Sequence, residues 1–172
     1  MAGGALEETV GRLLRDNHWT VAVAESCTGG LVSSRLTDVE GASDFVTLNV
    51  VTYSANEKIS VLGVTQETVD KYTVTSAECA MEMLAGLRSL TKADFCLSLT
   101  GLAGPGGGTP SKPVGLVYIG LYTPRRGGQV FRVEEPPGLT REQLKREFSQ
   151  RALELLRLAL CEATPPVTSS RL

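Results

Sequence analysis

The sequence predicts a single three-layer α/β/α domain with a mostly parallel or mixed central sheet. Short apolar runs rich in β-branched residues alternate with amphipathic segments of helical period, which is the order expected when helices connect strands. The 172 residues fall within the roughly 100–200 typical of one domain, and no internal repeat or linker divides them. We expect one domain over residues 1–162 and a disordered, proline- and serine-containing tail over residues 163–172.

The N-terminal half is predicted to alternate helices and strands. Leu6, Val10 and Leu14 recur at helical spacing, and the apolar run that follows them is short enough for a buried strand. In chain order we expect helices and strands at residues 6–14 (helix), 20–25 (strand), 31–36 (helix), 48–53 (strand) and 54–62 (helix).

The C-terminal half adds a helix, a strand, a hairpin and a long final helix. Thr75 and Glu78 have capping-box spacing ahead of an amphipathic segment, and a turn at residues 124–128 separates two apolar runs. Thr140 is a plausible N-cap for a helix that ends near Glu162. The remaining predicted elements are a strand at 95–100, a glycine-rich loop at 101–108 and hairpin strands at 114–122 and 129–134.

Composition excludes several partners and cofactors. Seventeen basic against nineteen acidic residues lack the excess that a nucleic-acid surface needs, so no nucleic-acid partner is expected. No apolar run is long enough for a membrane span, and residues 1–8 do not read as a signal peptide, which predicts a cytoplasmic protein without a membrane partner. The four cysteines form no C-x-x-C pair, so we expect neither a metal nor another cofactor.

The single histidine restricts the choice of a catalytic base. His18 lies between a predicted helix and a strand, outside every glycine-rich segment, and we interpret it as an ordinary loop residue. A hydrolase with a side-chain nucleophile would then use a lysine or a carboxylate as its base.

Three segments of the chain share one pattern, in which small or polar residues follow an apolar strand. They span residues 24–30, 51–58 and 98–105. Since ligands bind beyond the carboxyl ends of strands in open α/β sheets, we expect these turns to line one pocket. A helix that begins near Ser54 would return Lys58 to the same end of the sheet, where a partly buried lysine can act as a base to a serine.

Each motif also has a purely structural interpretation. Ser26, Thr28, Gly29 and Gly30 would offer hydroxyls and free amides to a phosphate or an oxyanion, or would simply form a tight turn capped by Ser26. The glycines of residues 104–108 allow close approach to a ligand or provide flexibility. Lys58 and Arg141 could equally be solvated helix residues, and the loop around Ser43 has the composition of an ordinary turn.

Taken together, the motifs resemble the C-terminal domain of the competence/damage-inducible protein CinA, over about residues 5–160. The segments that carry the resemblance are Ala-Glu-Ser-Cys-Thr-Gly-Gly at 24–30, Val-Thr-Tyr-Ser at 51–54 with Lys58, Thr-Gly-Leu-Ala-Gly-Pro at 100–105, and residues 107–109 and 112–115. Stand-alone forms of that domain are nicotinamide-nucleotide amidases, which convert nicotinamide mononucleotide to nicotinate mononucleotide and ammonia.

The resemblance implies roles for individual residues. It makes Ser43 the first candidate for the nucleophile and Lys58 the base, and it implies that Arg141 holds the nucleotide phosphate or assists catalysis. The family usually has Gly-Asp-Arg before the last helix whereas residues 138–141 read Gly-Leu-Thr-Arg, so Lys145 and Arg146 are alternatives for the phosphate contact. The other implied site residues are Tyr53, Thr100 and Ser26 in catalysis, and Thr28, Gly29, Gly30, Gly101, Gly104 and Gly106 in substrate binding.

The hypothesis at this point is a serine-lysine amidase. Neutral Lys58 would take the proton of a serine hydroxyl, Ser43 first and Ser26 second, and glycine-turn amides with Thr100 or Tyr53 would stabilise the oxyanion. The alternative is a nucleotide-binding or sensor module of the CinA type that does not turn its ligand over. We expect a small-molecule nucleotide as ligand and a homo-oligomer, in the first place a dimer.

Overall fold

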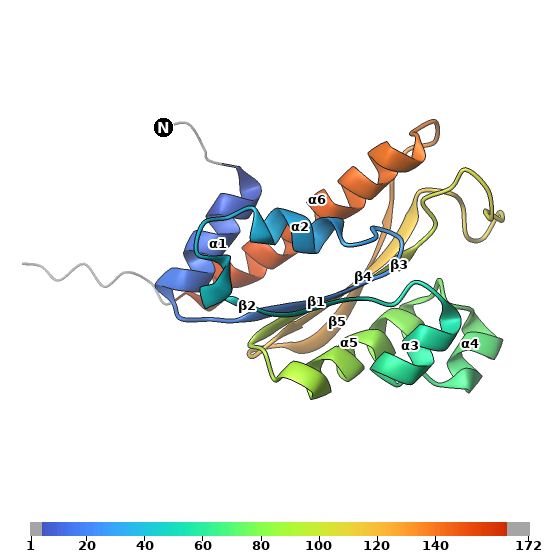
Figure 1. Ribbon diagram of the computed structural model, residues 1–172. Coiled ribbons are helices and arrows are strands. Elements are labelled where there is room, and N and C mark those ends of the chain that lie inside the picture. The colour runs from blue at the N-terminus through green and yellow to red at the C-terminus, as the bar shows by residue number, and fades with distance from the viewer. Residues whose placement is uncertain (1–4, 165–172) are drawn as a thin grey trace, which may run out of the picture.

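The computed structural model describes residues 5–164 and contains a five-stranded mixed sheet between two layers of helices (Figure 1). The strand order is β2-β1-β3-β4-β5. β1 (Val21–Glu25) lies between β2 (Val46–Val51) and β3 (Phe95–Gly101) and pairs parallel with both, whereas β4 (Leu116–Thr123) and β5 (Gly127–Glu134) continue the sheet antiparallel. This confirms the predicted three-layer α/β/α fold.

Within residues 5–164, three helices lie on each side of the sheet (Figure 1). α1 (Leu6–Asp16), α2 (Leu31–Thr37) and α6 (Arg141–Ala163) form one layer. α3 (Ala55–Leu62), α4 (Gln66–Tyr72) and α5 (Ala77–Thr91) form the other. A short 3-10 turn, η1 (Ala42–Asp44), precedes β2.

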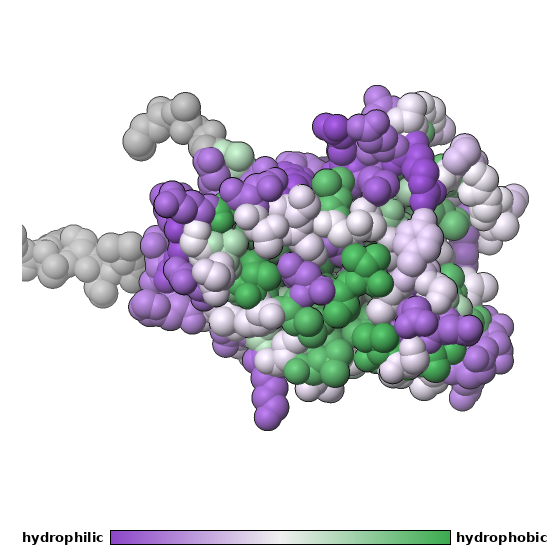
Figure 2. Space-filling view, viewed as in Figure 1, coloured by the Kyte–Doolittle hydropathy of each residue, from purple (hydrophilic) through white to green (hydrophobic). Residues whose placement is uncertain are grey.

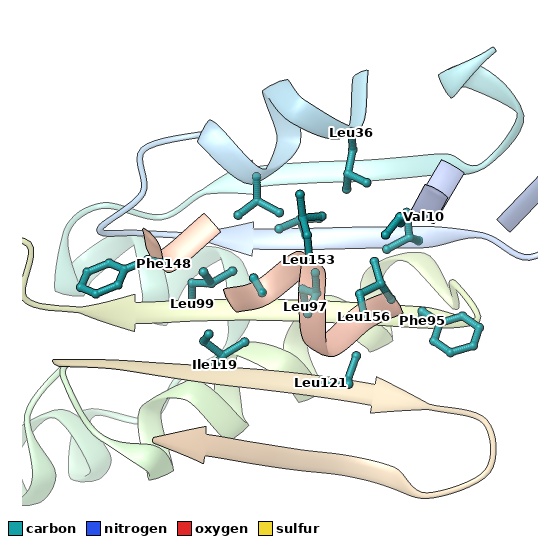
Figure 3. Packing of buried hydrophobic residues seen from close by; sticks show 14 of the residues in the cluster. Val10, Leu36, Phe95, Leu97, Leu99, Ile119, Leu121, Phe148, Leu153 and Leu156 are labelled. Carbon is teal, nitrogen blue, oxygen red and sulfur yellow. The ribbon is translucent and has the colours of Figure 1, made fainter. Parts of the chain in front are cut away.

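The larger hydrophobic core fills the space between the sheet and the layer of α1, α2 and α6. Leu97 and Leu99 of β3 and Ile119 of β4 meet Leu153 and Leu156 of α6 there (Figure 3). Their side chains are fully buried, and the burial of one such side chain contributes roughly 1.5–3 kcal/mol. A second buried cluster lies between the sheet and α5, so the strands are held from both faces.

The structure contains every helix and strand that the sequence predicts, with four differences. β2 begins at Val46, two residues before the predicted start, and the N-cap of α5 is Ser76 rather than Thr75, because the Ser76 hydroxyl accepts the Cys79 amide. α4 is an additional helix, seven residues long and largely exposed, so its sequence carries little apolar periodicity. In the predicted tail, Ala163 still belongs to α6, and residues 165–172 lie outside the described residues.

The surface carries an apolar region along the β2 edge of the sheet (Figure 2). β2 has no charged residue, and the side chain of Val51 at its end is 47% exposed. The expected homo-oligomer stays a prediction. No helix within residues 5–164 is long and apolar enough to cross a membrane.

Candidate active site

The candidate site lies beyond the carboxyl ends of the three parallel strands. Ser26 follows β1, Tyr53 lies two residues after β2, and Thr100 is next to the last residue of β3. The three turns that were predicted to share one pocket do line a single cavity of about 230 Å³. Its lining includes Ser26, Cys27, Tyr53, Lys58, Val74, Thr75, Thr100, Gly101, Leu102, Ala103, Gly104, Gly106 and Arg141.

Lys58 is the buried centre of this site. Ser54 caps α3 by accepting the Glu57 amide, and the first turn of the helix then directs Lys58 back toward β1. The side chain is 1% exposed, and its Nζ donates to Ser26 Oγ at 2.9 Å and to Thr52 O at 2.6 Å. The geometry thus joins Lys58 to the serine that sequence reasoning ranked second.

Burial also changes the protonation of Lys58. Desolvation lowers the pKa of its ammonium below the ordinary value, although Cys79 and Cys27 oppose this shift. Burial raises the pKa of the Cys27 thiol to about 12 and that of Cys79 to about 11, so both are neutral at neutral pH. Lys58 therefore loses its proton more readily than a solvated lysine, whereas Cys27 is a poor nucleophile.

Ser43 does not belong to this site, so its predicted pairing with Lys58 is wrong. Ser43 is exposed in η1, immediately before β2, whereas Lys58 comes after β2. A strand rises about 3.3 Å per residue, so the six residues of β2 place the two ends about 20 Å apart. Ser43 lies at the amino edge of the sheet and Lys58 at the carboxyl edge.

The turn after β1 is held from within by Glu25. This fully buried carboxylate accepts the backbone amides of Gly30 at 3.0 Å, Val32 at 3.2 Å and Ser33 at 2.8 Å. The prediction of free amides at the start of α2 is therefore wrong for these three, because Glu25 already caps them.

Thr28, Gly29 and Gly30 shape the turn and do not line the cavity. The Gly29 amide donates to Ser26 O at 3.0 Å, and both glycines have positive φ angles, 64° and 96°. Thr28 is fully buried, and its hydroxyl has no hydrogen-bond partner among the described residues. The backbone amides of Cys27 and Thr28, which follow Ser26 along the chain, contact the Cys27 thiol.

Arg141 lies at the site, as we expected from matching it to the arginine at the start of the family's last helix. Its Nη1 donates to Gly104 O and its Nη2 to the Tyr53 hydroxyl, both at 2.6 Å. Because the Tyr53 oxygen accepts this bond, its own O–H hydrogen remains free for a ligand. The Thr100 hydroxyl, by contrast, donates to Val74 O at 2.6 Å, so its hydrogen is already engaged.

The predicted glycines of the loop after β3 have different tasks. A side chain on Gly101 would meet Leu116 O at 2.5 Å, so this glycine permits strand pairing. Gly104 packs against Val114 at a φ of 62° and presents its carbonyl to Arg141. Gly106 faces open space beside the cavity, so it leaves room for a ligand.

A larger hollow of about 820 Å³ adjoins the site between α2 and α6, and Arg141 lines both. Lys145 and Arg146, the alternatives for a phosphate contact, line it together with Arg35. Arg35 pairs with Glu7 and Arg146 with Glu142. Lys145 Nζ lies 3.4 Å from where a Cβ of Gly29 would be, directly over the turn that follows Ser26.

Sequence reasoning missed Glu25 and Lys112. Glu25 is the only charged residue of a fully buried strand, and a buried carboxylate just before a helix start indicates a cap. Lys112 lies after the predicted glycine-rich loop, in the segment 112–115 that carries part of the family resemblance. Its partners Tyr72 and Thr73 belong to the unpredicted α4 and the residue after it. Within residues 5–164, no cluster of His, Cys, Asp and Glu could hold a metal ion.

Comparison with known proteins gives a consistent result. The family model of the CinA C-terminal domain matches residues 4–160. A CinA-like protein of Thermotoga neapolitana is 53% identical over 117 residues, which are 68% of this chain and 29% of that relative. This chain thus spans under a third of that relative's length.

Two solved structures extend the match over most of the fold. The competence damage-inducible protein A of Klebsiella pneumoniae aligns with a TM-score of 0.86 at 30% identity, over 92% of this chain and 97% of that one. The competence/damage inducible protein CihA of Agrobacterium tumefaciens aligns with a TM-score of 0.81 at 36% identity, over 94% and 98% of the respective chains. On the family match and these structures, the chain belongs to the CinA C-terminal domain family.

Proposed function

We propose that this domain hydrolyses the carboxamide of a nicotinamide nucleotide, in the first place nicotinamide mononucleotide, with Ser26 as nucleophile and Lys58 as base. The observation that carries the proposal is the 2.9 Å contact between Lys58 Nζ and Ser26 Oγ at a nearly solvent-free position. A nucleophile within hydrogen-bond reach of a base with a lowered pKa is the arrangement that amide hydrolysis needs. The substrate class rests on the family resemblance and on the cations beside the cavity.

The proposed reaction has two steps. Neutral Lys58 takes the Ser26 proton while Oγ attacks the amide carbon, and the resulting ammonium then gives a proton to the departing nitrogen as the C–N bond breaks. Ammonia leaves an ester on Ser26, and a water activated by Lys58 hydrolyses this ester to the free acid. The net change is one water consumed and one ammonia released.

The charge on the amide oxygen needs donors with free hydrogens. The amides of Cys27 and Thr28 follow the nucleophile directly, as oxyanion donors do in other serine hydrolases, and their present contact is with the Cys27 thiol, a weak acceptor that a charged oxygen would displace. The Tyr53 hydroxyl also qualifies, because Arg141 donates to its oxygen and leaves its hydrogen available. We assign the oxyanion to these groups and not to Thr100, whose hydrogen is directed to Val74 O.

The dimensions of the two hollows suit a nucleotide that spans both. The inner cavity of about 230 Å³ is below the roughly 300–1,000 Å³ of pockets that enclose a whole drug-sized ligand. We propose that the carboxamide ring enters it and that the phosphate lies in the outer hollow, where Arg141 and Lys145 supply positive charge.

The experiment is to incubate the protein with nicotinamide mononucleotide and measure ammonia release. Ser26→Ala and Lys58→Met should each lower kcat by about a thousandfold or more, while Ser43→Ala should leave it within about twofold. Full activity in Ser26→Ala, or loss in Ser43→Ala, would overturn the assignment of the nucleophile. Tight nucleotide binding without ammonia release would favour the sensor alternative.

A further inference from the structure

The glycine loop over the candidate site is tied to the rest of the fold at two points. The loop spans residues 102–115 between β3 and β4, and its neck is closed because the Gly115 amide donates to Leu102 O at 2.8 Å. Arg141 holds the first half of the loop through Gly104 O. The second half is held by Lys112, whose Nζ donates to the segment between α4 and α5.

Lys112 reaches the connection between α4 and α5. Its Nζ donates to Tyr72 O at 2.6 Å and to Thr73 Oγ1 at 2.8 Å. Tyr72 is the last residue of α4, so its carbonyl is one that helix bonding leaves unsatisfied and that a cation stabilises. Thr73, whose hydroxyl accepts from Lys112, has a φ of 69°, which is an uncommon backbone conformation for a β-branched residue.

The connection that Lys112 holds is a wall of the candidate site. Val74 and Thr75 line the cavity, as do Gly104 and Gly106 of the loop. The same wall is joined to the sheet by the Thr100 hydroxyl, which donates to Val74 O. Lys112 therefore joins the loop to this wall through its contacts with Tyr72 and Thr73.

We propose that Lys112 is a positioning residue that fastens the glycine loop over the site and so determines the affinity for substrate. The inference rests on the function proposed above. Lys112 does not line the cavity and touches neither Ser26 nor Lys58, so it acts through the loop. An unfastened loop is closed for a smaller fraction of the time, and the apparent affinity falls by that fraction while the bound complex reacts as before.

The test compares Lys112→Met with Lys71→Met, which removes the same charge from an exposed position on α4. Lys112→Met should raise KM for nicotinamide mononucleotide about tenfold or more, because the loss of a charge-assisted hydrogen bond commonly changes an equilibrium by that factor. Its kcat should stay within about twofold. Lys112→Arg should restore most of the affinity, and Lys71→Met should leave both constants unchanged.

Hydrogen exchange gives a second readout that needs no activity. In Lys112→Met the amides of residues 103–114 should exchange faster, while those of α6 keep their protection. Thr73→Val removes one acceptor of Lys112 and the long 3.5 Å bond from Thr73 Oγ1 to Thr75 O, and it should give a smaller change of the same kind if Lys112→Met fails to fold. Unchanged KM and unchanged loop exchange, or a loss confined to kcat, would overturn the proposal. If the wild-type protein releases no ammonia, the proposed function fails and loop exchange alone decides the role of Lys112.

Discussion

Because of Lys58, the protein should become more stable as the pH rises from the pKa of this lysine in the folded state to its pKa in the unfolded chain. Burial lowers the pKa of Lys58 in the folded state, whereas the unfolded chain keeps the ordinary value of 10.5. Between these two values the unfolded state binds more protons, so the free energy of unfolding rises with pH. One proton corresponds to a slope of at most about 1.4 kcal/mol per pH unit. Below the folded pKa both states are charged and this contribution is constant.

The measurement is urea unfolding of the wild-type protein and of Lys58→Met at several values between pH 7 and 10.5. Other groups titrate in both proteins, so the difference between the two free energies isolates Lys58. That difference should shift in favour of the wild type as the pH rises. In parallel, kcat/KM for the proposed amide hydrolysis should increase up to tenfold per pH unit below the folded pKa and then level off. A difference in stability that does not depend on pH would refute a buried lysine with a lowered pKa.

Three further substitutions test the framework around the site, each by urea unfolding at pH 7. Glu25→Gln should lower the free energy of unfolding by about 2 kcal/mol, since a charged acceptor of three helix amides is lost, while exposed Glu40→Gln should change it by less than roughly 0.5 kcal/mol. Gly86→Ala should cost about 1–3 kcal/mol because its Cβ would lie 1.8 Å from a carbonyl oxygen of α3, whereas Gly106→Ala meets no atom, and equal stabilities would contradict this account. Thr140→Ala should cost about 1 kcal/mol by removing the capping box of α6, and no loss would mean that packing alone sets the helix start.

The sequence predicted the sheet and most helices because the spacing of apolar residues, and the length of apolar runs, indicate which residues are buried. β3 is apolar on both faces since helices cover both, and its run of buried residues could be recognised without a structure. α4 could not be recognised, because it is short and its stability depends on contacts of Thr68 with Glu82 of α5. Such a helix depends on tertiary contacts that leave no periodic pattern in the sequence.

The sequence also contained enough information to reject Ser43. A residue that precedes a parallel strand lies at the amino edge of the sheet, whereas Tyr53 and Lys58 follow the same strand and lie at the carboxyl edge. Ser26 follows β1, which runs parallel to β2, so strand direction alone favours it as the partner of Lys58. The hydrogen-bond partners were not predictable, because Arg141 meets Tyr53 across 88 residues and Lys112 meets Tyr72 across 40.

The division of the sheet into a parallel and an antiparallel part explains why α6 supplies the cation at the site. β4 and β5 widen the sheet without adding a carboxyl-edge turn to the cavity, and they give α6 a surface on which to pack. The 23 residues of α6 extend about 34 Å at 1.5 Å per residue, and buried Leu144 and Phe148 anchor its first turns. Arg141, one turn before these anchors, is therefore fixed at the carboxyl edge by packing. Its contacts with Tyr53 and Gly104 are consequently set by the packing of α6 on the core.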